Sequence, residues 1–166
     1  MAKFTLDIEY DFNFMLFAIS SHEPDYKLCI AMNRALGIDF IREEPLELKN
    51  KKQEDQLLFS FFYYEDEAEY LEYNLVSNKS YNASKTVDPK KPAPPDLFGE
   101  TDPSATAQKA YLVPELANTD YLFILRTPYD PDVATAIENK LKQIPFILNI
   151  CVTDVNDLPS KKNLIF

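Results

Sequence analysis

Glycine, histidine and cysteine are scarce in this chain of 166 residues, and each shortage removes a class of chemistry. The two glycines, Gly37 and Gly99, are too few for a phosphate-binding P-loop or a glycine-rich dinucleotide motif. His22 is the only histidine, which excludes a metal site with two histidine ligands. The two cysteines, Cys29 and Cys151, lie far apart in apolar segments, so we expect reduced thiols in the core rather than a disulfide or a metal site.

Basic residues and long apolar runs are also in short supply. The 17 Lys and Arg residues stand against 27 Asp and Glu residues, which gives a formal net charge of −10. Because such a chain repels phosphate backbones, we expect no nucleic-acid binding. The longest apolar run, residues 14–19, is six residues long, whereas a membrane-spanning helix needs about 18. We expect no membrane contact and no cofactor, and the lack of an apolar signal sequence predicts a cytoplasmic protein.

Apolar residues are nevertheless plentiful, at 46% of the chain with 13% aromatic residues, which is enough to build a core. We predict a single domain over residues 1–166. One segment departs from this composition, at about residues 79–109, where five prolines occur with few large apolar side chains. Such a segment buries too little surface to offset its loss of conformational entropy, so we expect a mobile insertion there.

The apolar patterns along the chain predict an α+β fold. Alternation followed by an apolar stretch predicts a strand over residues 3–19, with a bend near 11–13. Stripes at helical spacing predict helices at about 24–36 and 131–144. The remaining predicted strands are 38–48, 56–64, 69–77, 121–125 and 146–152. Because each helix has one apolar stripe, we expect a two-layer sandwich, with both helices on one face of a mostly antiparallel sheet.

The two strands at 56–64 and 69–77 are predicted to form a β-hairpin with an acidic tip. The first strand is apolar on both faces and therefore needs cover on both. The helices cover one face, and three aromatic residues are the candidate interface on the other: Phe62, Tyr64 and Tyr70. A protein partner or a second copy of the chain is expected to cover this patch. The alternative is that the insertion or the C-terminal residues 163–166 pack there.

His22 lies close to hydroxyl and carboxylate side chains, the residue types of a nucleophilic triad. Ser20, Ser21 and Asp25 are all within three positions of it. Residues so close together at the start of a helix point in different directions, whereas a triad needs an ordered chain of hydrogen bonds. We therefore expect His22 and Asp25 to form capping or local hydrogen bonds, and we treat a ligand site as the alternative.

Three further polar residues are candidates for either a ligand site or a structural role. Asn33 lies at the margin of the buried stripe of the first helix, so a paired core amide is favoured over a contact to substrate. Glu115 and Asp120 follow Pro114, whose ring fixes φ, in a short segment before the strand at 121–125. We expect this segment to be a turn that sets the direction of that strand.

Four parts of the sequence resemble the IPExxxVD family, a group of small bacterial proteins named after a motif and without an established function. The naming motif stands here as Val113-Pro114-Glu115-Leu116-Ala117-Asn118-Thr119-Asp120. The other parts are residues 19–33, 75–80 and 161–166. The resemblance implies no catalytic residue and no cofactor.

These observations favour a non-catalytic cytosolic interaction module, which binds a protein partner or forms a homodimer through the sheet face opposite the helices. The alternative is a small-ligand-binding regulatory domain, with a pocket between the first helix and the strand after Val113. An enzyme comes third, because a chain with so few histidines and glycines offers few of the usual catalytic and phosphate-binding groups.

Overall fold

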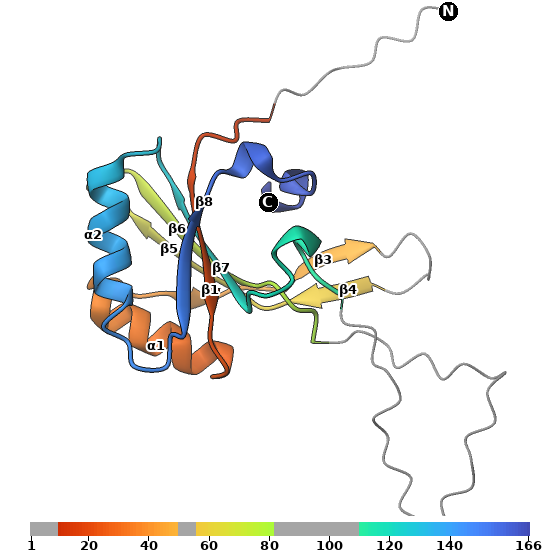
Figure 1. The fold of residues 1–166 in the computed structure, drawn as a ribbon, viewed down its shortest axis with the longest axis horizontal. Helices are drawn as coiled ribbons and strands as arrows, with labels where there is room; N and C mark the ends of the chain where they lie inside the picture. Colours follow the sequence, from red (N-terminus) through yellow and green to blue (C-terminus); the bar gives the residue numbers. More distant parts are fainter. Residues whose placement is uncertain (1–9, 50–55, 82–109) are drawn as a thin grey trace, which may run out of the picture.

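The computed structural model describes residues 10–49, 56–81 and 110–166. Two predictions fall largely outside these residues, namely the insertion at 79–109 and the first part of the strand at 3–19. Within the described ranges the chain forms a six-stranded sheet, a two-stranded sheet and two α-helices (Figure 1).

The larger sheet has the strand order β2-β5-β6-β7-β1-β8, and all its neighbouring strands are antiparallel. Its strands are β1 (Met15–Ser20), β2 (Ile41–Arg42), β5 (Phe61–Asp66), β6 (Leu71–Ser77), β7 (Tyr121–Arg126) and β8 (Asn149–Thr153). The smaller sheet pairs β3 (Leu46–Lys49) with β4 (Gln56–Phe59). The helices α1 (Asp25–Leu36) and α2 (Pro131–Leu141) lie on one face of the larger sheet (Figure 1). The predicted α+β fold is confirmed.

Two neighbouring inner strands of the sheet, β1 and β7, are buried on both faces. All residues at 15–19 and 121–125 are buried, as expected for strands that are apolar without alternation. On the helix side, the rings of Phe17 and Phe123 pack with their centroids 5.4 Å apart. Leu16 and Ile124 belong to a second apolar cluster on the opposite face. The core therefore has two halves, one on each side of these strands.

Each helix has one terminal signal in the sequence, whereas α1 begins after Pro24 without a side-chain cap. Asp130 caps α2 by accepting hydrogen bonds from the N–H groups of Asp132 and Val133. Gly37 ends α1 with a φ of 74°, the left-handed conformation that glycine adopts easily. Each helix buries one stripe: Leu28, Cys29 and Met32 on α1, and Ala134, Ile137 and Leu141 on α2. No helix in the described ranges combines the length and hydrophobicity that crossing a bilayer requires.

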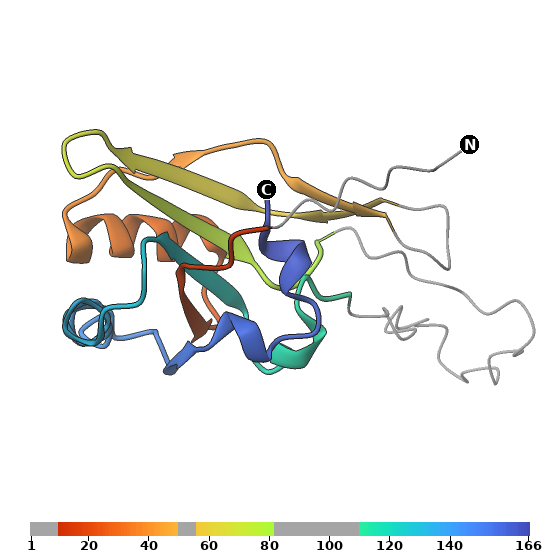
Figure 2. The same cartoon turned by 90° about the horizontal axis from the view of Figure 1, so that it is seen from above.

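The sheet face opposite the helices is covered by other parts of the same chain. Three short 3-10 helices lie on this side: η1 (Pro114–Leu116), η2 (Val155–Asp157) and η3 (Lys161–Leu164) (Figures 1 and 2). In the C-terminal segment, Val155, Leu158 and Leu164 are at most 5% exposed and belong to the second apolar cluster. The second face is apolar, as expected, but its central strands need no partner because the C-terminal segment covers them.

The aromatic patch expected at Phe62, Tyr64 and Tyr70 does not form. Phe62 is 5% exposed and Tyr64 is half-buried, and both pack in the cluster beneath the helices. Phe61 and Tyr63 of the same strand point to the other face instead. Because this strand is apolar on both sides, its alternation does not show which residues face the helices. Tyr70 is 88% exposed at the hairpin turn, away from the other two.

Candidate functional site

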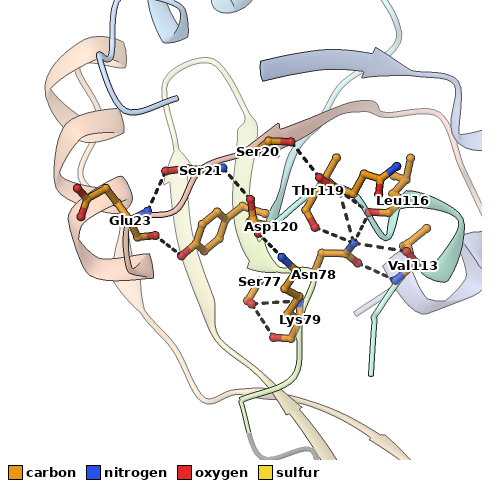
Figure 3. Close-up of polar contacts among 12 residues, drawn as sticks. Ser20, Ser21, Glu23, Ser77, Asn78, Lys79, Val113, Leu116, Thr119 and Asp120 are labelled. Carbon is orange, nitrogen blue, oxygen red and sulfur yellow. Dashed lines mark hydrogen bonds and ion pairs between the residues drawn. The ribbon is translucent and has the colours of Figure 1, made fainter. Parts of the chain in front are cut away.

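A network of polar groups surrounds the segment 113–120, with Asn78 at its centre (Figure 3). Asn78 directly follows β6 and is 0% exposed. Its Nδ2 donates hydrogen bonds to the main-chain oxygens of Leu116 and Thr119, at 2.8 and 3.3 Å. Its Oδ1 accepts a hydrogen bond from the N–H of Val113 at 2.9 Å. Both ends of the amide are paired, so Asn78 holds the loop that carries η1.

Asp120 joins the start of β7 to the strands on either side of it. Its Oδ2 accepts a hydrogen bond from the N–H of Ser21 at 2.8 Å, and its Oδ1 forms an ion pair with Lys79 (Figure 3). Its main-chain N–H donates to the carbonyl of Ile19 at 2.9 Å, and its carbonyl accepts from the N–H of Asn78 at 2.8 Å. These are the contacts of a structural turn, in which every hydrogen-bonding group of Asp120 is already used.

Glu115 holds the C-terminal segment rather than its own turn. Its Oε1 accepts a hydrogen bond from the N–H of Ser160 at 3.0 Å. Close by, Nδ2 of Asn163 donates to the carbonyl of Leu112 at 2.8 Å. Asn78 and Asp120 link three of the resembling parts, at 75–80, 113–120 and 19–33, and the bonds of Ser160 and Asn163 attach the C-terminal segment next to them. The motif therefore acts as the junction between the sheet and the cover of its second face.

The other three candidates lie apart from one another. His22 is exposed, and its side chain forms no hydrogen bond with a described residue. Asp25 accepts a hydrogen bond from the N–H of Tyr26 at 2.7 Å and lies 3.5 Å from the guanidinium of Arg42. The Oδ1 of Asn33 accepts a hydrogen bond from the N–H of Phe40 at 3.0 Å. The structure brings no hydroxyl, imidazole and carboxylate together here.

A groove of about 550 Å³ lies over β5 and β6 at the edge of the C-terminal cover. We call it the acidic groove, and it is lined by Glu43, Glu44, Leu46, Phe61, Tyr63, Glu72, Asn74 and Phe166. Neither Glu43 nor Glu44 forms an ion pair with a described residue, whereas Glu72 lies 3.4 Å from the guanidinium of Arg126. The lining therefore keeps a net negative charge.

Tyr63 lines the groove beside one of these carboxylates, Glu72. Burial, and next the carboxylates of Glu72 and Glu65, raise the pKa of the Tyr63 phenol above its ordinary value. The Tyr63 hydroxyl donates a hydrogen bond to Glu65 Oε2 at 3.2 Å. A negative phenolate is unfavourable beside these carboxylates, and a cation is favourable in the same place.

Asn74 lies in the middle of β6, on the wall of the acidic groove. Its cross-strand neighbours are Tyr63 on β5 and Ile124 on β7, and its side chain is 2% exposed. The buried Nδ2 donates a hydrogen bond to no described residue. A buried donor without an acceptor costs about 1–3 kcal/mol, and such groups are rare in native proteins. Asn74 is thus a donor for which the described fold supplies no acceptor.

One end of the groove is closed by Phe166, which Arg126 holds in place. The guanidinium of Arg126 lies 5.6 Å from the ring centroid of Phe14 and 5.4 Å from that of Phe166. Its Nη2 donates to the main-chain oxygens of Leu164 and Phe166, at 3.4 and 3.3 Å. The Phe166 ring meets that of Phe61 edge-on, with centroids 5.1 Å apart. The groove thus has an aromatic wall beside its carboxylates.

A second cavity, of about 400 Å³, lies between the residues before β1 and those after β8. It is lined by Phe12, Asn13, Phe14, Met15, Tyr129, Val152, Thr153, Asp154, Val155 and Asn156. Its one carboxylate, Asp154, caps η2 by accepting a hydrogen bond from the N–H of Asn156 at 2.9 Å. Neither cavity lies between α1 and β7, where we expected a pocket. There the Tyr121 hydroxyl instead donates to the carbonyl of Glu23 at 2.7 Å.

The chain matches no protein-family model, no curated protein and no solved structure. The resemblance to the IPExxxVD family therefore stays a prediction. What the geometry defines is a class of protein: an α+β domain with both sheet faces largely covered and an acidic groove at one side. In the described residues, no three His, Cys, Asp or Glu side chains are arranged to hold a metal ion.

Sequence reasoning missed the residues of the acidic groove. Asn74 gave a weak signal, since it is an amide within the apolar pattern of β6. Glu43 and Glu44 stand before Pro45 within the strand predicted at 38–48, with no sign of a ligand site. Only the pairing of β2 with β5 brings them to the groove over β5 and β6, and that pairing cannot be read from local pattern.

Proposed function

We propose that the protein is a non-catalytic interaction module that binds a protein partner through the tip of its β5–β6 hairpin. The observation that carries this proposal is Tyr70, which is 88% exposed and has a φ of 54°. Figure 2 shows the hairpin turn at the end of the strands remote from β3 and β4. The tip is therefore open to a large partner.

The turn is ordered without help from the Tyr70 side chain. Asp66 Oδ1 accepts hydrogen bonds from the N–H groups of Ala68 and Glu69, at 3.1 and 3.3 Å. The left-handed conformation costs a residue with a Cβ roughly 1–2 kcal/mol, and glycine or asparagine normally takes such positions. An exposed tyrosine here contributes little to folding and carries that cost. A rigid aromatic side chain with a polar tip is, however, a typical anchor of protein interfaces.

The charge around Tyr70 defines the partner's chemistry. Glu65, Glu67 and Glu69 are all exposed beside it. A basic surface with a recess for the phenol ring complements this tip, whereas two copies of the acidic tip repel each other. We therefore place a different, basic protein at this tip and not a second copy of the chain.

The test is photo-crosslinking in cells that make the protein. We expect p-benzoylphenylalanine in place of Tyr70 to give one adduct of defined mass, whose partner peptide is rich in Lys and Arg. The matched control is the same replacement at Tyr129, which is 61% exposed and far along the chain. Equal adducts at both positions, no adduct at position 70, or an adduct of twice the mass of the chain would each contradict the proposal.

The proposal also includes the cellular compartment and the protein family. We place the interaction in the cytoplasm, and the support is that both cysteines are free thiols, with Cys29 buried and Cys151 exposed. Membership of the IPExxxVD family is supported by the way in which the resembling segments meet around Asn78 and Glu115.

A second candidate function is a small-ligand-binding regulatory domain. The specific observation that favours it is the unpaired donor of Asn74 in the wall of the acidic groove. This function requires a ligand whose chemistry fits that groove.

A further inference from the structure

We propose that the acidic groove binds a small organic cation, an amine or guanidine, that also carries a carbonyl or similar hydrogen-bond acceptor. This inference rests on the second candidate function, the ligand-binding domain, and is independent of the hairpin-tip contact. The proposed ligand-binding site is formed by the strands β5 and β6, the connection between β2 and β3, and Phe166.

The ligand needs a hydrogen-bond acceptor because of Asn74. This residue is only 2% exposed, and its Nδ2 has no acceptor among the described residues. Asn78, four positions along the chain, shows the usual outcome for a buried amide here, with partners at both ends. An amide left unpaired in a cavity wall is suited to a ligand that supplies the missing acceptor.

The ligand needs a positive charge because of the carboxylates that line the acidic groove. Glu43 and Glu44 line the groove and form no ion pair with a described residue, whereas Arg126 offsets the charge of Glu72. These glutamates are not arranged as a metal-ligand set, since the described residues hold no group of three such ligands. An organic cation tolerates the wider spacing, because each of its N–H groups can reach a different carboxylate.

The size and the apolar wall limit the ligand further. A volume of about 550 Å³ falls in the range of small-molecule sites rather than of protein interfaces. Phe61 and Phe166 offer ring surface to the carbon chain or the guanidinium plane of a ligand. A cation with a short apolar chain and one carbonyl therefore matches every part of the lining.

Three probes separate these requirements. L-argininamide has both the cation and the carbonyl, agmatine has the cation without the carbonyl, and Nα-acetylcitrullinamide has the carbonyl without any charge. Calorimetric titration of the full chain should rank argininamide first, with the other two weaker by about tenfold or more, which is the loss of one hydrogen bond or one charge contact. Added salt should weaken argininamide binding because it screens the carboxylates.

Two variants test the site itself. Asn74→Ala, which removes the amide without adding volume, should lower the affinity for argininamide about tenfold and leave that for agmatine nearly unchanged, since agmatine has no carbonyl for Asn74. Glu43→Gln with Glu44→Gln, both at exposed positions, should weaken argininamide and agmatine alike. The matched control is Glu67→Gln with Glu69→Gln, which removes the same charge at the hairpin tip.

The outcomes also separate this inference from the hairpin-tip proposal. The tip variants should lose the crosslinked partner and keep argininamide, and the groove variants should do the reverse. No binding of argininamide at millimolar concentration would overturn the inference. So would binding that neither Asn74→Ala nor the groove double variant weakens, or equal affinities for argininamide and Nα-acetylcitrullinamide.

Discussion

Replacing Asn74 by leucine should make the protein more stable, although the change is at a buried position. Relief of the unpaired Nδ2 is worth about 1–3 kcal/mol. Leucine also adds apolar surface next to Ile124, while its extra volume extends toward the open groove rather than into filled core. Overpacking, which costs about 1–3 kcal/mol in a closed core, is therefore small here. We expect a net gain of about 1 kcal/mol.

Urea denaturation measures this gain. With a slope of about 2 kcal/mol per molar urea, a gain of about 1 kcal/mol raises the midpoint by about 0.5 M with no change in slope. Asn78→Leu is the matched control, because it makes the same substitution where both ends of the amide are paired. It leaves the N–H of Val113 and the carbonyl of Thr119 without their Asn78 partner and should cost about 3 kcal/mol or more.

The two asparagine variants should therefore shift the midpoint in opposite directions. A loss of more than about 1 kcal/mol in Asn74→Leu would show that this amide has a stabilising partner in solution, such as an ordered water. The reasoning about the groove would then lose its starting point.

Three other predictions concern the turn, the thiols and the C-terminal segment. Tyr70→Asn should raise the free energy of unfolding by about 0.5–1 kcal/mol in urea denaturation, since asparagine tolerates the left-handed conformation; a loss of stability would show that the phenol contributes to the fold. Burial raises the pKa of Cys29 to about 11, so a thiol reagent at pH 8 should label the exposed Cys151 and spare Cys29 in the native protein. Because the pKa of Cys29 is raised in the folded state, its contribution to the free energy of unfolding is complete below about pH 9 and is lost as the pH rises through 11. The fall in stability over this pH range should therefore be smaller in Cys29→Ala. Identical pH profiles of stability for the two proteins would contradict this. Arg126→Met should free Phe166 and increase carboxypeptidase cleavage, at a cost of about 1–2 kcal/mol, whereas unchanged cleavage would mean that apolar packing alone holds the segment.

Much of this fold could be predicted from local pattern. Asp130 marks the start of α2 and Gly37 marks the end of α1, whereas no side chain caps the start of α1. The strands β1 and β7, which are apolar without alternation, are buried on both faces. Pro45, which cannot donate to a β-ladder, lies between β2 and β3 within the strand predicted at 38–48.

The orientation of β5 could not be predicted, because both of its faces are apolar. The alternation that would distinguish Phe61 and Tyr63 from Phe62 and Tyr64 is absent, so the wrong pair was assigned to the free face. The chain also passes from one sheet to the other at Ser60, so that the strand predicted at 56–64 is divided into β4 and β5. Nothing in the local sequence marks that change of sheet.

The candidate site shows the same limit. Asp120 lies in the turn expected before β7, whereas Glu115 binds the C-terminal segment, and their partners Ser21 and Ser160 lie at distant positions in the chain. The acidic groove depends wholly on such pairings, since its carboxylates and its amide come from β2, β6 and their connections.

The position of β1 between β7 and β8 has a consequence for synthesis on the ribosome. Ile19 pairs with Tyr121, about 100 residues further on, and Leu16 pairs with Thr153. The apolar strand β1 therefore has no partner strand to pair with until most of the polypeptide has been synthesised. The β5–β6 hairpin is local in sequence and can form early, whereas β1 can pair with β7 and β8 only late. During that interval the exposed apolar segment of β1 is a binding site for a chaperone.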